Sequence, residues 1–510
     1  MKVWMLMACV VASSLVHAAG SGKAPVVQID SGRISGLTSA GISAFKGIPY
    51  AEPPVGDLRW RAPQSVHAWS GTRKANAVGP LCMQEINPKD NGVGPPPASE
   101  DCLNLDVYTS KPTGKAKLPV MFWIHGGGYV NGSGTAALYD GTELAKQGVV
   151  VVSINYRLGR FGFFAHPALT RENPQGPLGN YAIMDQIAAL QWVKRNIAAF
   201  GGDPDNVTIF GESAGGGSVI NLMISPAAVG LFHKVISESG VARLNFPNLH
   251  QDHFQTVLSA EDGGRAFAEE MGVSGDDVAA LRAIPAQRII DAGDPDISVG
   301  GPMIDGKILT SRADVAFESG SQAKVPFLLG SNALEFPPKP DFPGHFAELV
   351  KFPAPEGARL MAAYGSEDTY RKNIVSDILF NEPAKFLARV QSGVAPVFLY
   401  KFSVLSEQAP KDIEAAPHAS DRQYVFRTLK ASPWPTGPRD EKAAALISAY
   451  WVAFAKTGDP NGGGRLRWPK YSPSDDQLIN FRNDGPIVEK TPNSNALDVL
   501  SSGYLAPSPR

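Results

Sequence analysis

The chain has few of the features that would tie it to a specialised class of protein. It holds three cysteines in 510 residues, 19% of its residues are charged, and its formal net charge is −2. So few cysteines exclude a disulfide-dense scaffold, and the near-balanced charge leaves no basic footprint for nucleic acid. No block of like charges marks an interaction tail. A composition that is 43% hydrophobic is instead typical of a large globular protein that needs no metal to fold.

Long apolar runs are also absent, apart from a short one at the N-terminus. Lys2 is followed by an apolar stretch over residues 3–12 and by small residues that end at Ala18. This order predicts a cleavable signal peptide over residues 1–18 and a secreted or periplasmic mature protein. A retained membrane anchor is one alternative, although the stretch is too short to span a bilayer. A lipoprotein modified at Cys9 is another, although Met7 is a poor fit to the small residue expected before such a cysteine. Elsewhere no segment approaches the roughly 18 unbroken apolar residues of a membrane span.

Two cysteines, Cys82 and Cys102, remain once the signal peptide is removed. In an oxidising compartment such an even pair indicates a disulfide, which would close a loop containing the proline run 95–97. Two buried free thiols are the alternative. The spacing is not that of a zinc site, and we expect no metal and no other cofactor.

Strand and helix patterns alternate along the chain. Short apolar runs predict buried strands, most of them parallel, at residues 118–124, 149–154, 207–210, 234–238, 325–330 and 396–402. Helical periodicity predicts a helix at residues 181–199, and helix-compatible composition predicts one at 136–147. Further helices are expected at residues 214–223 and, as a terminal helix, 440–456. The fold class is therefore α/β, with a mostly parallel central sheet flanked by helices. Acidic, alanine-rich stretches predict a helical cap at about residues 241–312, inserted in a single domain that covers residues 19–510.

The strongest chemical signal is the pentapeptide Gly-Glu-Ser-Ala-Gly over residues 211–215. It follows a predicted strand and opens a predicted helix, as the nucleophile elbow of an α/β-hydrolase requires. Glycines flank the serine because a Cβ would clash in so sharp a turn. The motif predicts Ser213 as a nucleophile; a glycine-rich turn without chemistry is the alternative.

Chain order selects the partners of Ser213, because this fold places the acid after the serine and the base last. His418 lies in a loop after the predicted strand at 396–402, where the base belongs, whereas the other later histidines precede any suitable strand. Glu335 directly follows the strand predicted at 325–330 and is the expected acid. Asp305 is the runner-up, since its Asp-Gly setting is typical of a simple turn.

A second glycine motif, His-Gly-Gly-Gly-Tyr over residues 125–129, follows the predicted strand at 118–124. Lipase-type esterases aim backbone N–H groups of such a loop at the substrate oxygen, and the residue after the nucleophile, Ala214, supplies another. His125 precedes the nucleophile, which favours a structural role over a catalytic one.

The residues around these motifs resemble type-B carboxylesterases, the cholinesterase-like branch of the α/β-hydrolases. The likeness covers nearly the whole mature chain and is densest at residues 45–54, 99–103, 155–157 and 200–213. It implies the α/β-hydrolase fold in a secreted bacterial member.

The resemblance also assigns residues. It implies that Gly127, Gly128 and Ala214 are the oxyanion donors, that Cys82 and Cys102 form the family's first disulfide, and that Arg157 and Asp185 form a structural ion pair. One departure stands out: the acid segment of the family ends Asp-Glu-Gly, whereas here it reads Leu-Glu-Phe over residues 334–336. The acid is kept, and we expect the pocket beside it to differ.

Together these patterns predict a serine carboxylic ester hydrolase that acts through Ser213, His418 and Glu335 and an acyl-enzyme. Its partners are a small-molecule ester and water. Two other functions are alternatives for this chain. One is an amide or thioester hydrolase with the same triad, and the other is a non-catalytic, adhesion-type binding module. The motifs select neither the ester nor an oligomeric state. An apolar entrance, or simple packing of the cap, is indicated by four residues: Phe336, Phe342, Phe346 and Phe352.

Overall fold

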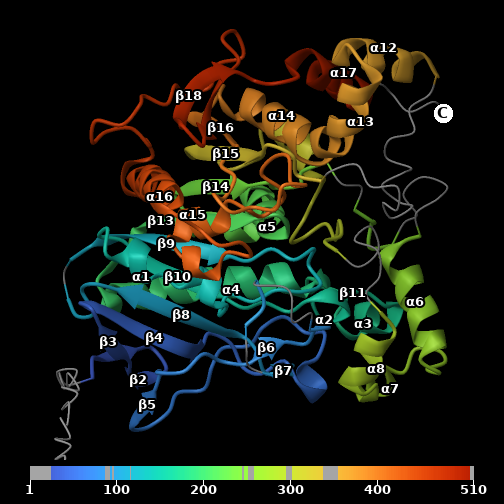
Figure 1. Ribbon diagram of the computed structural model, residues 1–510. Coiled ribbons are helices and arrows are strands. Elements are labelled where there is room, and N and C mark those ends of the chain that lie inside the picture. Colours follow the sequence, from blue (N-terminus) through green and yellow to red (C-terminus); the bar gives the residue numbers. More distant parts are fainter. Residues whose placement is uncertain are drawn as a thin grey trace, which may run out of the picture.

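The structure is a computed structural model that describes residues 24–86, 92–94, 97–114, 116–243, 246–250, 258–293, 301–336 and 354–505. The predicted signal peptide lies outside these residues. A large sheet runs through the described chain, and helices cover both of its faces (Figure 1).

The central sheet contains eleven described strands. In chain order they are β3 (Leu37–Ser39), β4 (Ile42–Pro49), β8 (Asn104–Thr109), β9 (Leu118–Ile124), β10 (Val150–Ile154), β13 (Gly202–Glu212), β14 (Lys234–Glu238), β15 (Phe327–Asn332), β16 (Val397–Phe402), β17 (Gln477–Arg482) and β18 (Gly485–Lys490). Their order across the sheet is β18-β17-β16-β15-β14-β13-β9-β10-β8-β4-β3. The strands from β17 to β10 are parallel, and the outer ones pair antiparallel. This parallel core brings the carboxyl ends of its strands to one edge of the sheet.

The middle strands are buried on both faces, which explains their continuous apolar sequences. In β9, Val120, Phe122 and Ile124 pack into one hydrophobic core, while Met121 and Trp123 pack into the other. All six predicted strands are confirmed, and β13 begins earlier in the chain than its apolar run indicated.

Helices pack on the two faces through these cores. On one face lie α4 (Tyr181–Asn196) and α5 (Ala214–Ile224); on the other lie α1 (Thr142–Ala145), α15 (Arg422–Phe426) and α16 (Pro438–Thr457). The predicted helices at 181–199, 214–223 and 440–456 are confirmed. The single helix predicted at 136–147 is wrong: a 3₁₀ turn at Ala137–Tyr139 precedes the short α1. The reason is a local turn, because the Asp140 carboxylate accepts the Thr142 N–H at 2.9 Å and Gly141 breaks the helical pattern.

The region of the predicted cap is helical where it is described. It contains α6 (Ala260–Glu270), α7 (Val278–Ala283) and α8 (Ala286–Asp291), and α10 (Ala313–Glu318) follows. Side-chain caps start two of these helices: Ser259 accepts the Asp262 N–H, and Asp277 accepts the Ala280 N–H. In Figure 1, α6, α7 and α8 lie beside α3 (Pro167–Glu172), at one end of the sheet.

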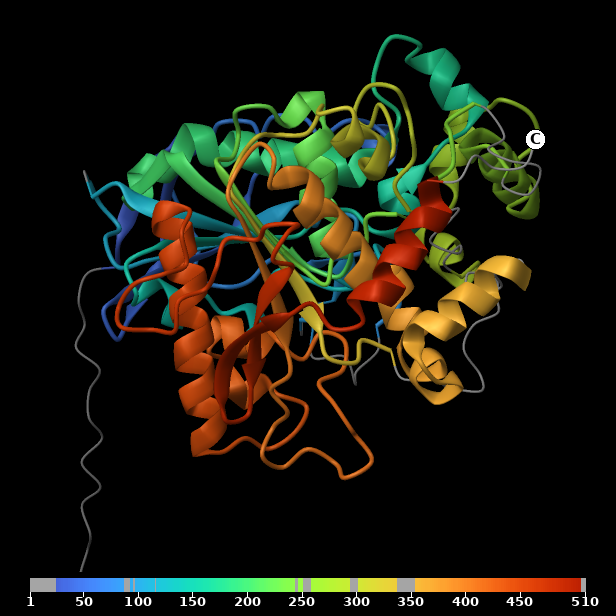
Figure 2. The ribbon, with the colours of Figure 1, turned by 90° about the horizontal axis from the view of Figure 1, so that it is seen from above.

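A second helical group extends from a face of the sheet, where one of its helices packs against β15 and β16, toward the same end of the sheet (Figures 1 and 2). It contains α12 (Ala354–Tyr364), α13 (Glu367–Ser376), α14 (Glu382–Gln391) and α17 (Ser494–Leu505). The last of these packs against both α12 and α14. Of the four phenylalanines expected at the entrance, Phe342, Phe346 and Phe352 lie outside the described residues.

Several short elements were not predicted from the sequence, because they contain too few residues to show a hydrophobic periodicity. They are β1 (Val26–Ile29), β2 (Gly32–Ser35), β5 (Thr72–Lys74), β6 (Leu81–Cys82), β7 (Ala98–Ser99), β11 (Phe163–Phe164), β12 (Gly179–Asn180) and α2 (Gly159–Gly162). The helix at 440–456 is also not terminal, since the β17–β18 hairpin and α17 follow it. Among the described helices, none is both long enough and apolar enough to cross a membrane.

Candidate active site

Ser213 stands at the turn between β13 and α5, with φ 56° and ψ −120°. A non-glycine residue tolerates such a backbone only where its surroundings enforce it, as at a functional turn. The Ser213 N–H donates to the Glu238 carbonyl at 2.9 Å and so ties the turn to β14. A Cβ at Gly215 would lie 2.1 Å from the Ile124 carbonyl oxygen, which explains why this position must be glycine.

His418 reaches Ser213 from the loop between β16 and α15. Its Nε2 lies 2.8 Å from the Ser213 Oγ, and its backbone N–H donates to the Glu335 carbonyl at 2.9 Å. The His418 Nδ1 lies 2.6 Å from the Glu335 Oε2. Because a carboxylate can only accept, Nδ1 carries the proton and Nε2 is free to accept from the serine hydroxyl.

Glu335 is fully enclosed, with a relative exposure of 1%. Its second oxygen, Oε1, accepts from the Ser239 Oγ at 2.6 Å and from the Asn332 N–H at 2.6 Å. Three donors therefore hold one carboxylate in place. The sequence reasoning missed Ser239, although its position directly after β14 was a usable signal.

Asp305, the runner-up acid, serves a turn. Its carboxylate accepts the N–H groups of Ile308 at 3.0 Å and Leu309 at 2.7 Å. The structure therefore brings together Ser213, His418 and Glu335, and it gives Asp305 a local structural role.

Glu212 is a further charged group beside the histidine, and the sequence reasoning passed over it. Its Oε1 lies 3.3 Å from the His418 Nε2, and the side chain is 1% exposed. Burial disfavours the charged imidazolium, but the carboxylates of Glu212 and Glu335 outweigh it and raise the pKa of His418 above its ordinary value. These carboxylates would therefore stabilise a protonated His418.

Two more buried acids, Glu238 and Asp421, lie near Glu212. Glu238 is the register partner of Glu212 on the neighbouring strand, and its Oε1 accepts from the Trp451 Nε1 at 2.7 Å. Asp421 accepts from the Tyr400 hydroxyl at 3.2 Å. Burial, together with neighbouring acids, raises the pKa of both Glu238 and Asp421. These acids therefore hold protons more tightly than exposed carboxylates do.

The glycine loop predicted for oxyanion binding directly follows β9. Gly127 and Gly128 have φ 107° and 61°, where side chains are strained, and a Cβ at Gly127 would lie 2.2 Å from the Asn131 carbonyl oxygen. Within the described residues, neither N–H of this glycine pair donates to a protein acceptor. Ala214 opens α5, so its N–H is among those that a helix leaves unpaired.

His125, which precedes these glycines, packs inside the protein. It is 1% exposed and stacks on Tyr156 with ring centroids 4.4 Å apart. Burial lowers its pKa to about 4, so the ring is neutral at physiological pH.

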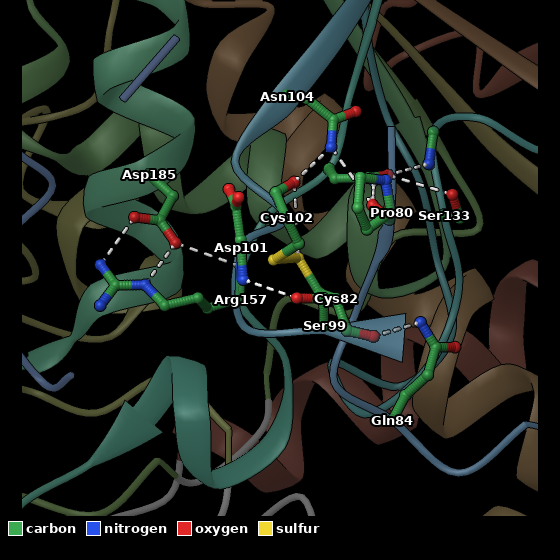
Figure 3. The surroundings of a disulfide bond; sticks show 12 residues. Pro80, Cys82, Gln84, Ser99, Asp101, Cys102, Asn104, Ser133, Arg157 and Asp185 are labelled. Atoms are coloured by element: carbon green, nitrogen blue, oxygen red, sulfur yellow. Dashed lines mark hydrogen bonds and ion pairs between the residues drawn. A yellow bond between two sulfur atoms is a disulfide. The ribbon is translucent and has the colours of Figure 1, made fainter. Parts of the chain in front are cut away.

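Cys82 and Cys102 form a disulfide, as the sequence predicted (Figure 3). Both residues are buried. The Asn104 amide donates to the Cys102 carbonyl at 2.9 Å, and the Gln84 amide donates to the Cys82 carbonyl at 3.0 Å. Closing a loop of this length contributes about 3 kcal/mol in the chain-entropy model.

The ion pair implied by the resemblance is also present near the disulfide (Figure 3). The Arg157 guanidinium donates to the two Asp185 carboxylate oxygens at 2.8 and 2.7 Å, and both side chains are buried. In the described part of the chain, no group of three or more His, Cys, Asp or Glu side chains is arranged to hold a metal ion.

Comparison with known proteins shows the family of the chain. The family model described as "Carboxylesterase family" matches residues 23–338 and 364–500. The chain belongs to the carboxylesterase family. Its relatives include a fumonisin B1 esterase of Sphingopyxis macrogoltabida, 35% identical over 88% of this chain and 84% of the relative. A para-nitrobenzyl esterase of Bacillus subtilis is 35% identical over 88% of this chain and 92% of its own length.

Solved structures show the same fold. A PNB esterase superposes with a TM-score of 0.82 at 32% identity and covers 95% of this chain and 99% of its own. A Geobacillus stearothermophilus carboxylesterase has a TM-score of 0.78 at 32% identity, with coverage of 93% and 99%. This carboxylesterase therefore has the α/β-hydrolase fold and is an ester hydrolase, as its sequence predicted.

Proposed function

We propose that this carboxylesterase cleaves its ester through a Ser213–His418–Glu335 triad and a covalent acyl-enzyme. The observation that carries the proposal is the unbroken chain of hydrogen bonds from the Ser213 Oγ to the His418 Nε2, at 2.8 Å, and from the His418 Nδ1 to the Glu335 Oε2, at 2.6 Å. A serine hydroxyl is a weak nucleophile, and such a base and acid are the groups that activate it.

Acylation begins when the Ser213 Oγ attacks the ester carbonyl carbon. The hydroxyl proton passes to the His418 Nε2, and the carbonyl π electrons move onto the substrate oxygen to form a tetrahedral oxyanion. Glu335 keeps the Nδ1 proton in place and stabilises the resulting imidazolium. The intermediate collapses by breaking the bond to the alcohol oxygen, which leaves with the proton from Nε2, and Ser213 remains acylated.

Deacylation repeats these steps with water. His418 takes a proton from the water as its oxygen attacks the acyl carbon, and the same proton returns to the Ser213 Oγ as the acid leaves. We assign the N–H groups of Gly127, Gly128 and Ala214 to the oxyanion. Each such donor contributes about 3 to 4 kcal/mol of transition-state stabilisation in comparable enzymes.

The substrate we propose is a small-molecule carboxylic ester. Relatives named fumonisin B1 esterase and para-nitrobenzyl esterase support this class. We further propose that α6 to α8 belong to a cap that shapes the acyl and alcohol pockets. The substrate preference is measured with p-nitrophenyl esters of increasing acyl length and with bulky aromatic and polycarboxylic esters. Faster cleavage of matched amides or thioesters would favour the alternative, an amide or thioester hydrolase.

Hydrolysis should depend on pH through a single base. His418 must be neutral to accept the serine proton, so kcat/KM for p-nitrophenyl butyrate falls as the pH falls through its pKa. Because that pKa is raised, the midpoint lies above about 6.5, the ordinary value for histidine. Glu212→Gln removes one of the charges that raise the pKa and moves the midpoint down. A flat profile from about pH 5 to 8 contradicts the assignment of the base.

We also propose that residues 1–18 are a signal peptide and that the mature chain is secreted or periplasmic. The disulfide between Cys82 and Cys102 supports export, because such bonds persist in oxidising compartments. N-terminal sequencing of protein recovered outside the cytosol should begin at Ala19. Recovery of a chain that still begins at Met1 contradicts the proposal.

A further inference from the structure

The long helical stretch from α13 to α14 is interrupted by one π-helical turn, Asp377–Asn381. Pro383, near the start of α14, supplies a physical reason. Proline has no N–H to donate to the carbonyl four residues earlier, that of Leu379, and its ring crowds that carbonyl. A wider turn relieves both problems, and such turns recur at functional sites.

The π turn presents Phe380 to the catalytic histidine. The Phe380 ring centroid lies 5.0 Å from that of His418, and Phe336 lies 4.9 Å from the same ring. The two phenyl centroids are 5.7 Å apart. Three such similar distances describe one compact cluster, and phenyl rings this close to each other do not sandwich the imidazole.

Hydrogen bonds of polar side chains hold the π turn at its first and last residues, Asp377 and Asn381. The Asp377 carboxylate, 1% exposed, accepts from the Tyr364 hydroxyl at 2.6 Å and from the Asn493 amide at 3.2 Å. Asn381 accepts from the Ser331 hydroxyl on β15, the strand that leads to Glu335. The turn is thereby tied to the core and to the strand that carries the acid.

A second tie joins the helix to the acid loop. The Phe336 N–H donates to the Ser376 Oγ at 3.3 Å, one residue before the π turn. Phe336 directly follows Glu335, so the segment that orients the acid and the segment that carries Phe380 are held as one unit.

We propose that Phe380 is a positioning residue that holds the His418 ring in line with Ser213. The proposal rests on the triad proposed above. Phe380 is 3% exposed and occupies the space into which the imidazole would otherwise rotate, and it excludes water from that part of the ring. Such positioning matters because small displacements of a catalytic group lower the rate steeply.

The test compares Phe380→Ala and Phe380→Leu with the wild type, using p-nitrophenyl acetate, butyrate and hexanoate. Phe380→Ala should lower kcat by about 10- to 100-fold for all three esters, with KM within about twofold, because misplacement affects the transition state and not substrate binding. Phe380→Leu keeps apolar cover and should lose less. If the alanine variant does not fold, the leucine variant carries the comparison.

Phe386→Leu is the matched control for the loss of a buried ring from the same helical stretch. Phe386 is 2% exposed and packs against Arg243, whose guanidinium lies 3.7 Å from the ring centroid. This variant should keep kcat within about twofold. An unchanged kcat in folded Phe380→Ala, or a changed KM and acyl ranking with kcat intact, overturns the positioning role. If the triad proposal itself is wrong, a separate variant shows it, because Ser213→Ala then keeps its activity.

Discussion

Ser213→Ala should abolish nearly all ester hydrolysis in a protein that stays folded. Removing the nucleophile of a serine hydrolase lowers kcat by about 10⁶-fold, because base and acid then have nothing to activate. The fold should survive, because alanine meets the same backbone strain at φ 56° that serine already tolerates. Steady-state kinetics with p-nitrophenyl butyrate and a thermal melt measure the two effects.

A reactive organophosphate provides a second measurement on the same variant. The wild type should be labelled once, at Ser213, and Ser213→Ala should not be labelled. Ser225→Ala is the control, because Ser225 is also buried but ends α5 at its far terminus, and it should keep near-normal activity. Near-normal hydrolysis by Ser213→Ala contradicts the assignment, and a folded wild type that is never labelled favours the binding-module alternative.

Glu335→Gln should lower kcat by about 10⁴-fold while keeping the shape of the site. The Glu335 carboxylate accepts from three donors: the His418 Nδ1, the Ser239 hydroxyl and the Asn332 N–H. A glutamine has a single acceptor oxygen, so its NH₂ must face one of these donors. If it faces His418, the imidazole takes the tautomer with its proton on Nε2 and no longer accepts from Ser213.

Asp305→Asn is the matched control for Glu335→Gln, because it makes the same chemical change in the competing acid. Its side-chain oxygen can still accept the N–H groups of Ile308 and Leu309, so we expect a change in melting temperature at most and an unchanged kcat. An equal loss of kcat in both variants, or more than a tenth of wild-type activity in Glu335→Gln, contradicts the choice of acid.

The sequence by itself determined the parts of the site that are local. A strand, a sharp turn and a helix are contiguous in the chain, so the pentapeptide predicted the position of Ser213. The glycine motif after β9 likewise predicted a loop whose backbone comes close to a substrate, since such an approach requires glycine. Chain order then selected His418 and Glu335, and the alternation of apolar and helical segments predicted the α/β fold. The helix predicted at 136–147 was wrong because its helix-compatible composition did not reveal the turn that Asp140 forms.

Only the tertiary structure decided how distant residues act together. His418 lies 205 residues from Ser213 and 83 from Glu335, and hydrogen bonds join all three only after the sheet aligns the ends of its strands. The same alignment brings Ser239 to Glu335 and Phe380 to His418. It also surrounds the histidine with carboxylates that raise its pKa. Periodicity and motifs describe neighbours along the chain, whereas these contacts depend on which strands lie side by side.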